Sequence, residues 1–220
     1  MKRALVVGAS GGIGHALVQE LRHRGHHVST LSRGSDQFDI TDEACIIDAL
    51  GRVTGPFETI IVATGALEIG AFGPEKQIKA LDPGALASQF ALNAIGPALV
   101  LKHALQYMPR DRRSVFAALS ARVGSIGVNR LGGWYSYRAS KAALNQLIHT
   151  AAIEVARSHK QAICVTLHPG TVATRFTEKY AGHPRVSAAQ AASNLLWVIE
   201  GLSPSQSGKF FDWRGAEVAW

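Results

Sequence analysis

The chain has 220 residues, of which 47% are hydrophobic and 18% charged, so a disordered chain is excluded and one globular domain spanning residues 1–220 is expected. Its two cysteines, Cys45 and Cys164, lie far apart in the sequence, which argues against a disulfide framework and against a zinc site, and no metal is expected. The net charge of +7 comes from scattered Lys and Arg residues, so nucleic-acid binding is not expected. The positive electrostatic potential instead suits an anionic ligand such as a phosphorylated cofactor.

The N-terminal stretch "MKRALVVGAS" has a short apolar run that meets a glycine-rich loop too soon for a signal-peptide core. No stretch approaches the roughly 18 apolar residues of a membrane span. We therefore expect a cytoplasmic protein with no membrane partner.

Apolar runs and helical periodicity alternate along the chain. Six short apolar runs predict strands at 4–10, 26–32, 58–64, 114–120, 162–170 and 209–213. Helical periodicity covers 14–24, 83–107, 135–158 and 188–201. This alternation predicts an α/β domain with a doubly wound parallel sheet of the Rossmann type, and ligands are expected where the strand order reverses.

The first predicted strand leads into a glycine-rich loop and then a helix. Gly8, Gly12 and Gly14 allow a tight turn and a close approach of the backbone to a pyrophosphate, and Ser10 and Ile13 lie between them. A glycine triplet alone is a weak signal, but a strand before it and a helix after it are the context of a dinucleotide site.

The end of the second predicted strand indicates which nucleotide is bound. An acid there, roughly 20 residues after the glycine loop, suits the ribose of NAD, whereas an arginine suits the 2′-phosphate of NADP. Ser32 and Arg33 stand at this place, which favours NADP(H), while the nearby Asp36 keeps NAD open.

A tyrosine and a lysine share one face of the third predicted helix. Tyr137 and Lys141 are four positions apart. A nearby ammonium favours the phenolate and lowers the pKa of a tyrosine, which makes the phenol a workable acid for reduction of a carbonyl. An exposed tyrosine beside a solvated lysine is the alternative, and the dinucleotide loop favours the catalytic interpretation.

Together these motifs resemble the short-chain dehydrogenase/reductase family over nearly the whole chain. The matching segments are GASGGIG (8–14), FDIT (38–41), ALNAIGP (91–97), YSYRASK (135–141) and HPGTVAT (168–174). SARVGSI (120–126), the residues around YSYRASK and the ending SGKFFDW are similar to the subgroup of C-factor and Sniffer-like carbonyl reductases. The resemblance implies an NADPH-dependent carbonyl reductase acting on a small carbonyl or alcohol. An NADP(H)-binding signalling or regulatory protein of the C-factor type is the alternative.

The resemblance also implies catalytic roles. Tyr137 would protonate the substrate oxygen, Lys141 would hold the nicotinamide ribose and lower the tyrosine pKa, and Asn93 would anchor a water in a proton relay. An asparagine that bonds its own helix backbone is the alternative for Asn93.

The remaining cofactor contacts implied by the resemblance lie in two segments. Asp39 and Ile40 would flank the adenine. Pro169, Gly170, Val172 and Thr174 would close over the nicotinamide, with backbone contacts from Val172 to its carboxamide.

The serine of the family pattern is displaced. Ser120 matches the first of the two serines that usually end this strand, and Ala121 stands where the second belongs. We expect Ser125 to orient the substrate oxygen, with Ser120 as the second candidate and a site without such a serine as the third.

Two other departures concern the loops. Ala63, Thr64 and Gly65 replace the usual asparagine-rich turn, yet they keep small residues against the cofactor. Only five residues separate Arg33 from Asp39, which leaves no room for a full helix and predicts that the family's third strand is vestigial.

On the substrate side, the segment between Thr174 and Ser187 forms a short polar lid, which predicts an open pocket. The pocket could be lined by Trp134, Phe176 and Tyr180, and the alternative is that these side chains are packing residues of the protein interior. The small and apolar residues of helices 83–107 and 135–158 favour a homodimer, as in the family, although that face could also be buried against the sheet.

Overall fold

A six-stranded parallel sheet forms the centre of the molecule. The computed structural model describes residues 2–178 and 185–220. The strands are β1 (Arg3–Val7), β2 (His27–Leu31), β3 (Thr59–Val62), β4 (Ser114–Leu119), β5 (Ala162–His168) and β6 (Phe210–Asp212). Their order is β2-β1-β3-β4-β5-β6 and every neighbouring pair is parallel. The predicted doubly wound α/β fold is confirmed.

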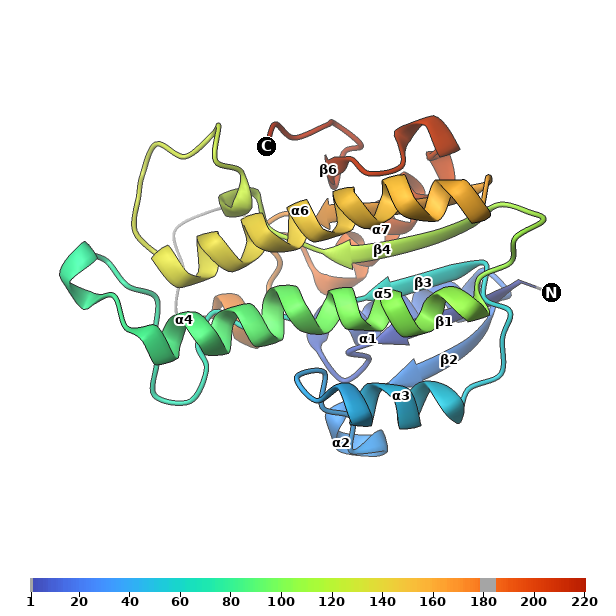
Figure 1. Ribbon diagram of the computed structural model, residues 1–220, viewed down its shortest axis with the longest axis horizontal. Coiled ribbons are helices and arrows are strands. Elements are labelled where there is room, and N and C mark those ends of the chain that lie inside the picture. Colours follow the sequence, from blue (N-terminus) through green and yellow to red (C-terminus); the bar gives the residue numbers. More distant parts are fainter. Residues whose placement is uncertain (1, 179–184) are drawn as a thin grey trace.

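Helices cover both faces of the sheet (Figure 1). The main helices are α1 (Gly12–His23), α3 (Glu43–Gly51), α4 (Pro83–Phe90), α5 (Gly96–Ala104), α6 (Tyr135–Ser158) and α7 (Ala188–Gly201). Buried side chains of α3, α5 and α6 form a core on one face, and those of α1 and α7 form a second core on the other. Because both faces are covered, β3 and β4 are buried at every residue, which is why their sequences are continuous apolar runs.

The helix predicted over 83–107 has a π-helical turn in its middle, at Ala91–Ile95, where α4 passes into α5. Short π segments inside helices occur frequently at functional sites, and this one carries Asn93. The 25-residue segment Pro83–Tyr107 is also long and apolar enough to cross a membrane, since an 18-residue window within it has a mean hydropathy of 1.4. The expectation that no stretch approaches a membrane span is therefore wrong on composition, but the helix packs on α3 and α6 as a core element.

The chain between β2 and α3 is short, as the sequence predicts. The four-residue helix α2 (Arg33–Asp36) is all that forms after β2, and within residues 33–42, all of them described, no strand follows it. The helix α3 was not predicted from the sequence, although Asp42 accepts a hydrogen bond from the Ala44 N–H and so caps it. In place of a third strand, β2 forms one edge of the sheet.

The strand order reverses between β1 and β3, because the chain first runs outward to β2 and then crosses back to β3. The loops that follow β1 and β3 consequently meet at the carboxyl edge of the sheet. This is the position at which ligands bind in open α/β sheets.

Candidate active site

The loop after β1 leaves room for glycine alone at two positions. Gly8 has a φ of +88°, and a Cβ on it would lie 2.9 Å from Cγ2 of Thr64. A Cβ on Gly14 would lie 2.1 Å from the carbonyl oxygen of Gly8, so the start of α1 packs directly on the loop. Gly11, the N-cap of α1, supplies no side chain to the first-turn N–H groups, which leaves them available to an anion. The glycine cradle thus fits a dinucleotide pyrophosphate.

Two other predicted cofactor residues of this segment differ in position. Ser10 is exposed in the turn, whereas Ile13 is half-buried and packs on the core between α1 and the sheet. Ser10 is accessible to a ligand, and Ile13 anchors the helix.

The loop after β3 lies between the glycine loop and α6. A Cβ on Gly8 would lie 3.0 Å from the backbone carbon of Ala63, which shows how closely the two loops pack. The hydroxyl of Thr64 is buried and has no hydrogen-bond partner among the described residues. A Cβ on Gly65 would lie 3.4 Å from Nζ of Lys141, so this small-residue loop reaches α6.

Asn93 holds the same loop in place. Its amide donates to the carbonyl of Ala66 at 2.9 Å and accepts from the Ala66 N–H at 3.1 Å, and it also donates to Gln89. The side chain is fully buried. Neither interpretation of Asn93 from the sequence included this bond to another segment: the amide ties the loop after β3 to the π-helical turn.

Tyr137 and Lys141 are both buried on one face of α6. The ammonium of Lys141 donates a 2.8 Å hydrogen bond to the carbonyl of Leu119 at the end of β4. Burial lowers the pKa of Lys141 to about 7 and raises the pKa of the Tyr137 phenol well above its usual value. The expected lowering of the tyrosine pKa is not observed, because loss of hydration dominates both groups. The phenol therefore keeps its proton at neutral pH.

Aromatic side chains surround the tyrosine. The ring centroids of Trp134 and Phe176 lie 6.3 Å and 6.0 Å from that of Tyr137. A narrow cleft beside Tyr137 is also lined by Leu67 and the buried Glu75. Two of the three aromatic residues suggested for the substrate pocket thus lie at the tyrosine, and Tyr180 lies outside the described residues.

The first turn of α6 is held by Glu75, which the sequence analysis did not single out. Its carboxylate accepts from the N–H and the hydroxyl of Ser136, and its backbone carbonyl accepts from the Trp134 N–H. Trp134 itself has a φ of +55°, an unfavourable conformation for a residue with a side chain. An isolated glutamate far from the motif gave no signal of this role.

The two candidate serines differ in their hydrogen bonds. Ser125 is buried, and its hydroxyl oxygen accepts from the Val128 N–H at 3.3 Å. Ser120 lies at the end of β4 with a buried hydroxyl that has no partner among the described residues. Ala121 is half-buried beside it. Both serines remain candidates at this edge.

The loop after β5 closes the site from the other side. A Cβ on Gly12 would lie 2.6 Å from Cγ2 of Thr174, so this loop touches the start of α1. Val172 is buried and pairs with Val186. Pro169 and Gly170 are half-buried, and Gly170 has a φ of +81°.

Trp213 covers this loop, which the sequence analysis did not anticipate. A Cβ on Gly170 would lie 3.0 Å from Cδ1 of Trp213. The preceding residue, Asp212, is fully buried and pairs with Arg122 at 2.7 Å and Arg214 at 3.3 Å. The ends of β4, β5 and β6 are thereby joined next to the site.

At the end of β2 an arginine side chain is exposed, and the nearby aspartate is engaged in hydrogen bonds within its own turn. Arg33 is exposed, whereas the Asp36 carboxylate accepts from the Ser32 N–H at 2.8 Å and from the Ser35 hydroxyl at 2.6 Å. Ser32 itself is buried. Asp36 therefore stabilises its own turn, and Arg33 is free to meet a ligand.

Of the two residues predicted to flank the adenine, Asp39 is exposed and Ile40 is buried. Asp39 is exposed and accepts from the N–H and hydroxyl of Thr41, which lowers its pKa. The side chain of Ile40 is buried in the core, and a Cβ on Gly96 would lie 2.6 Å from its carbonyl oxygen. Ile40 can therefore flank a ligand only through its backbone.

Comparison with known proteins gives a consistent result. The family model described as short chain dehydrogenase matches residues 2–184. The C-signal protein of Myxococcus xanthus is 34% identical over 168 residues, which cover 76% of this chain and 95% of that protein.

Two solved structures share the fold over the full chain. The carbonyl reductase Sniffer of D. melanogaster has a TM-score of 0.83 at 20% identity, with 100% of both chains covered. An NADPH-bound carbonyl reductase from chicken fatty liver has a TM-score of 0.84 at 25% identity, covering 100% of this chain and 99% of that one. The resemblance inferred from the motifs is confirmed.

Proposed function

The chain belongs to the short-chain dehydrogenase family, and from this membership we propose that it is an NADPH-dependent reductase of small carbonyl compounds. Tyr137 and Lys141, buried one turn apart on α6 beside the loop of Gly65, are the observation that carries the proposal. The chain thereby combines a dinucleotide cradle with a protonated phenol at its edge.

In this proposal the tyrosine is the general acid. NADP(H), when bound, supplies the hydride to the carbonyl carbon. Tyr137 gives its phenolic proton to the oxygen on which negative charge develops. The phenol is protonated at neutral pH, so the proton is present before reaction. Lys141, which the bond to the Leu119 carbonyl holds in place, stabilises the phenolate that remains and contacts the nicotinamide ribose.

The other residues orient the reactants. Ser125 donates to the substrate oxygen in our proposal, and the Ala66–Asn93 pair keeps the loop after β3 against the cofactor. Asn93 would in addition anchor the water of a proton relay. Pro169, Gly170, Val172 and Thr174 border the nicotinamide. Aromatic side chains at Tyr137 favour a substrate with an apolar part.

NADP(H) is proposed over NAD(H) because of the groups at the end of β2. Arg33 is exposed and basic, and Asp36 is occupied within its own turn. A guanidinium there matches the charge of a 2′-phosphate. The carbonyl reductase from chicken fatty liver, similar in fold, contains NADPH.

We further propose a cytoplasmic homodimer that binds neither nucleic acid nor membranes. Ile95, Leu147 and Ile153 are exposed on the helices that pair in this family. Light scattering after gel filtration tests the dimer, and a monomer at micromolar concentration would contradict it.

The test of the function is turnover of NADPH, followed by absorbance, with a panel of aldehydes, ketones and diketones. The wild type is compared with Tyr137→Phe, and NADH serves as the parallel cofactor. We expect turnover that prefers NADPH and falls by about a hundredfold or more in Tyr137→Phe, with NADPH affinity unchanged. NADPH binding without turnover of any substrate would instead support the signalling alternative.

A further inference from the structure

A second cleft lies at the amino-terminal edge of the sheet, opposite the candidate active site. Its volume is about 320 Å³, within the range of sites for small organic molecules. Leu21, Leu196 and Ile199, from α1 and α7, form its floor, and each shows only a small edge to the cleft. Its polar lining consists of Lys2, His26, Glu58, Thr59, Arg112, Arg113 and Glu200.

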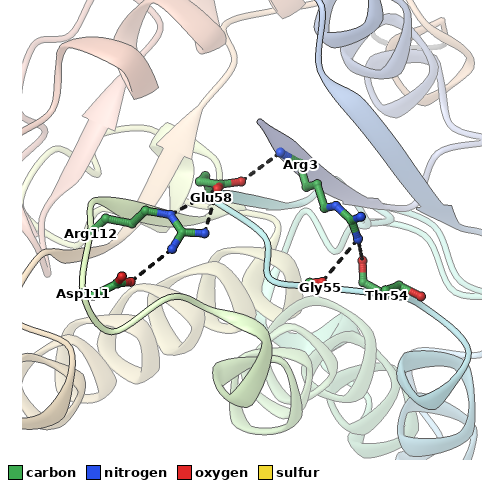
Figure 2. A network of polar contacts seen from close by, with 6 residues as sticks. All are labelled: Arg3, Thr54, Gly55, Glu58, Asp111 and Arg112. Atoms are coloured by element: carbon green, nitrogen blue, oxygen red, sulfur yellow. Dashed lines mark hydrogen bonds and ion pairs between the residues drawn. The ribbon is translucent and has the colours of Figure 1, made fainter. Parts of the chain in front are cut away.

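Glu58 and Arg112 form one wall of the cleft and belong to a wider polar network (Figure 2). The Glu58 carboxylate accepts from the Arg3 N–H at 2.8 Å and from the Arg112 guanidinium at 3.0 Å. The guanidinium of Arg3 donates to the carbonyls of Thr54 and Gly55. Because these contacts join the starts of β1, β3 and β4, the wall is organised before any ligand arrives.

Both acids of the cleft are already paired. Glu58 pairs with Arg112, which also pairs with Asp111, and Glu200 forms a 2.9 Å ion pair with Arg24, which also pairs with Glu20. Each acid of the lining thus has an arginine partner within the protein. A cationic ligand would have to displace one of these arginines.

Two basic side chains of the lining have no ion-pair partner among the described residues. Arg113 donates to the carbonyls of Ile199 and Leu202, at the end of α7, and makes no ion pair within residues 2–178 and 185–220. These carbonyls satisfy the hydrogen-bond donors of the Arg113 guanidinium, but they balance its positive charge only in part. The exposed ammonium of Lys2 likewise makes no ion pair in the described part of the chain.

His26 has a ring nitrogen without a hydrogen-bond partner among the described residues. Its Nδ1 atom is buried and makes no hydrogen bond to any described residue. Burial and the nearby ammonium of Lys2 lower the pKa of His26, so the imidazole is neutral at pH 7. A neutral imidazole with the proton on Nδ1 donates one hydrogen bond, and a ligand oxygen would satisfy it.

We propose that this cleft binds a small organic carboxylate with a short apolar chain. The carboxylate would pair with Lys2, with Arg113 adding positive charge, and a turn of the His26 ring would bring its buried Nδ1 to a carboxylate oxygen. The apolar chain would lie on the edges of Leu21, Leu196 and Ile199 and on the stems of the basic side chains. The proposal is independent of the catalytic one, because the two sites lie at opposite ends of the strands.

Calorimetric titration of the full chain with hexanoate, in the presence of saturating NADPH, tests the site. We expect binding with a Kd of roughly 1 mM, typical of a ligand of this size, and weaker binding by about tenfold or more in Lys2→Glu. Lys160→Glu is the matched control, since Lys160 is exposed at the same end of the sheet and does not line the cleft. The Kd of Lys160→Glu for hexanoate should stay within about twofold of the wild-type value.

Three further measurements locate and classify the ligand. The imidazole ¹⁵N signal of His26 should shift on addition of hexanoate in the wild type and not in Lys2→Glu. Hexylamine, of opposite charge, and inorganic phosphate, without the apolar chain, should bind at least about tenfold more weakly. The proposal is overturned if hexanoate does not bind, if it competes with NADPH, if Lys160→Glu weakens binding as much as Lys2→Glu, or if hexylamine or phosphate binds equally well.

Discussion

The ammonium of Lys141 donates a 2.8 Å hydrogen bond to the backbone carbonyl of Leu119, so a buried cation on α6 is fastened to the end of β4. One hydrogen bond does not offset the loss of hydration, and the pKa of Lys141 falls to about 7. The position is therefore retained at a cost to stability, which is a common property of functional sites.

Lys141→Met should stabilise the free protein while abolishing turnover. The folded pKa of about 7 lies below the ordinary value of 10.5, so between these values the unfolded chain binds more protons and wild-type stability rises with pH. The gain in the variant is expected to be greatest near pH 6, on the order of a few kcal/mol, and to shrink towards pH 10. Urea unfolding at several pH values measures it, with Lys79→Met, at an exposed site, as the control. A gain that does not change with pH would contradict the interpretation.

Arg33→Ala should change the choice of cofactor. Removing the exposed guanidinium is expected to raise KM for NADPH by about tenfold and leave KM for NADH nearly unchanged, because only NADPH carries the 2′-phosphate. Steady-state kinetics with both cofactors measures this, and Arg22→Ala, another exposed arginine, is the control. An equal effect on NADPH and NADH would show that Arg33 does not recognise the phosphate.

The two serines are distinguished by single substitutions. Ser125→Ala should lower kcat by about a hundredfold through loss of one donor to the developing oxyanion. Ser120→Ala should leave kcat unchanged and stability equal or slightly higher, because the buried Ser120 hydroxyl has no partner among the described residues. The opposite pattern in kcat would assign the role to Ser120. If neither variant loses activity, the site works without a serine.

Asp212→Asn should destabilise the protein, most clearly at neutral pH. Burial raises the pKa of Asp212, but the N–H groups of Arg214 and Ala216 and the Arg214 side chain outweigh it, so the folded pKa lies below the ordinary 3.8. The stabilisation is therefore present above that value and is lost as pH falls through the folded pKa. Because both arginine side chains are partly exposed to solvent, the loss is expected to be about 1–3 kcal/mol near pH 7.

Thermal unfolding from pH 3 to pH 7 follows this effect. The difference in melting temperature between the wild type and Asp212→Asn should become smaller as the pH falls towards 3. Asp48→Asn, which removes the acid of an exposed pair with Arg52, should show little change at any pH. A constant difference across the range would exclude ionisation of Asp212 as the cause.

The strands and the glycine loop could be predicted from the sequence because each is determined by residues that are close together in the chain. A strand buried on both faces must be apolar throughout, and the turn after β1 needs glycine because a Cβ on Gly14 would meet the Gly8 carbonyl. The short helix α3 was missed because it covers only part of one sheet face, and its capping aspartate was not weighed.

The electrostatics of the site could not be predicted in the same way. From the sequence only the charge of Lys141 was available, and it implied a lowered tyrosine pKa. The burial of Tyr137, which raises that pKa, arises from residues distant in the chain, including Glu75 and Phe176. Asn93 shows the same limit, since its partner Ala66 lies 27 positions away.

The shortened segment after β2 also affects how the molecule behaves at high concentration. With no strand beyond it in residues 33–42, β2 presents one row of unpaired N–H and C=O groups, a template on which another extended chain could add. The strand is only five residues long and carries His27, Ser29 and Thr30, so the template is brief and polar. Mutations that replace these residues with large apolar ones would create an aggregation-prone edge without disturbing the catalytic end of the sheet.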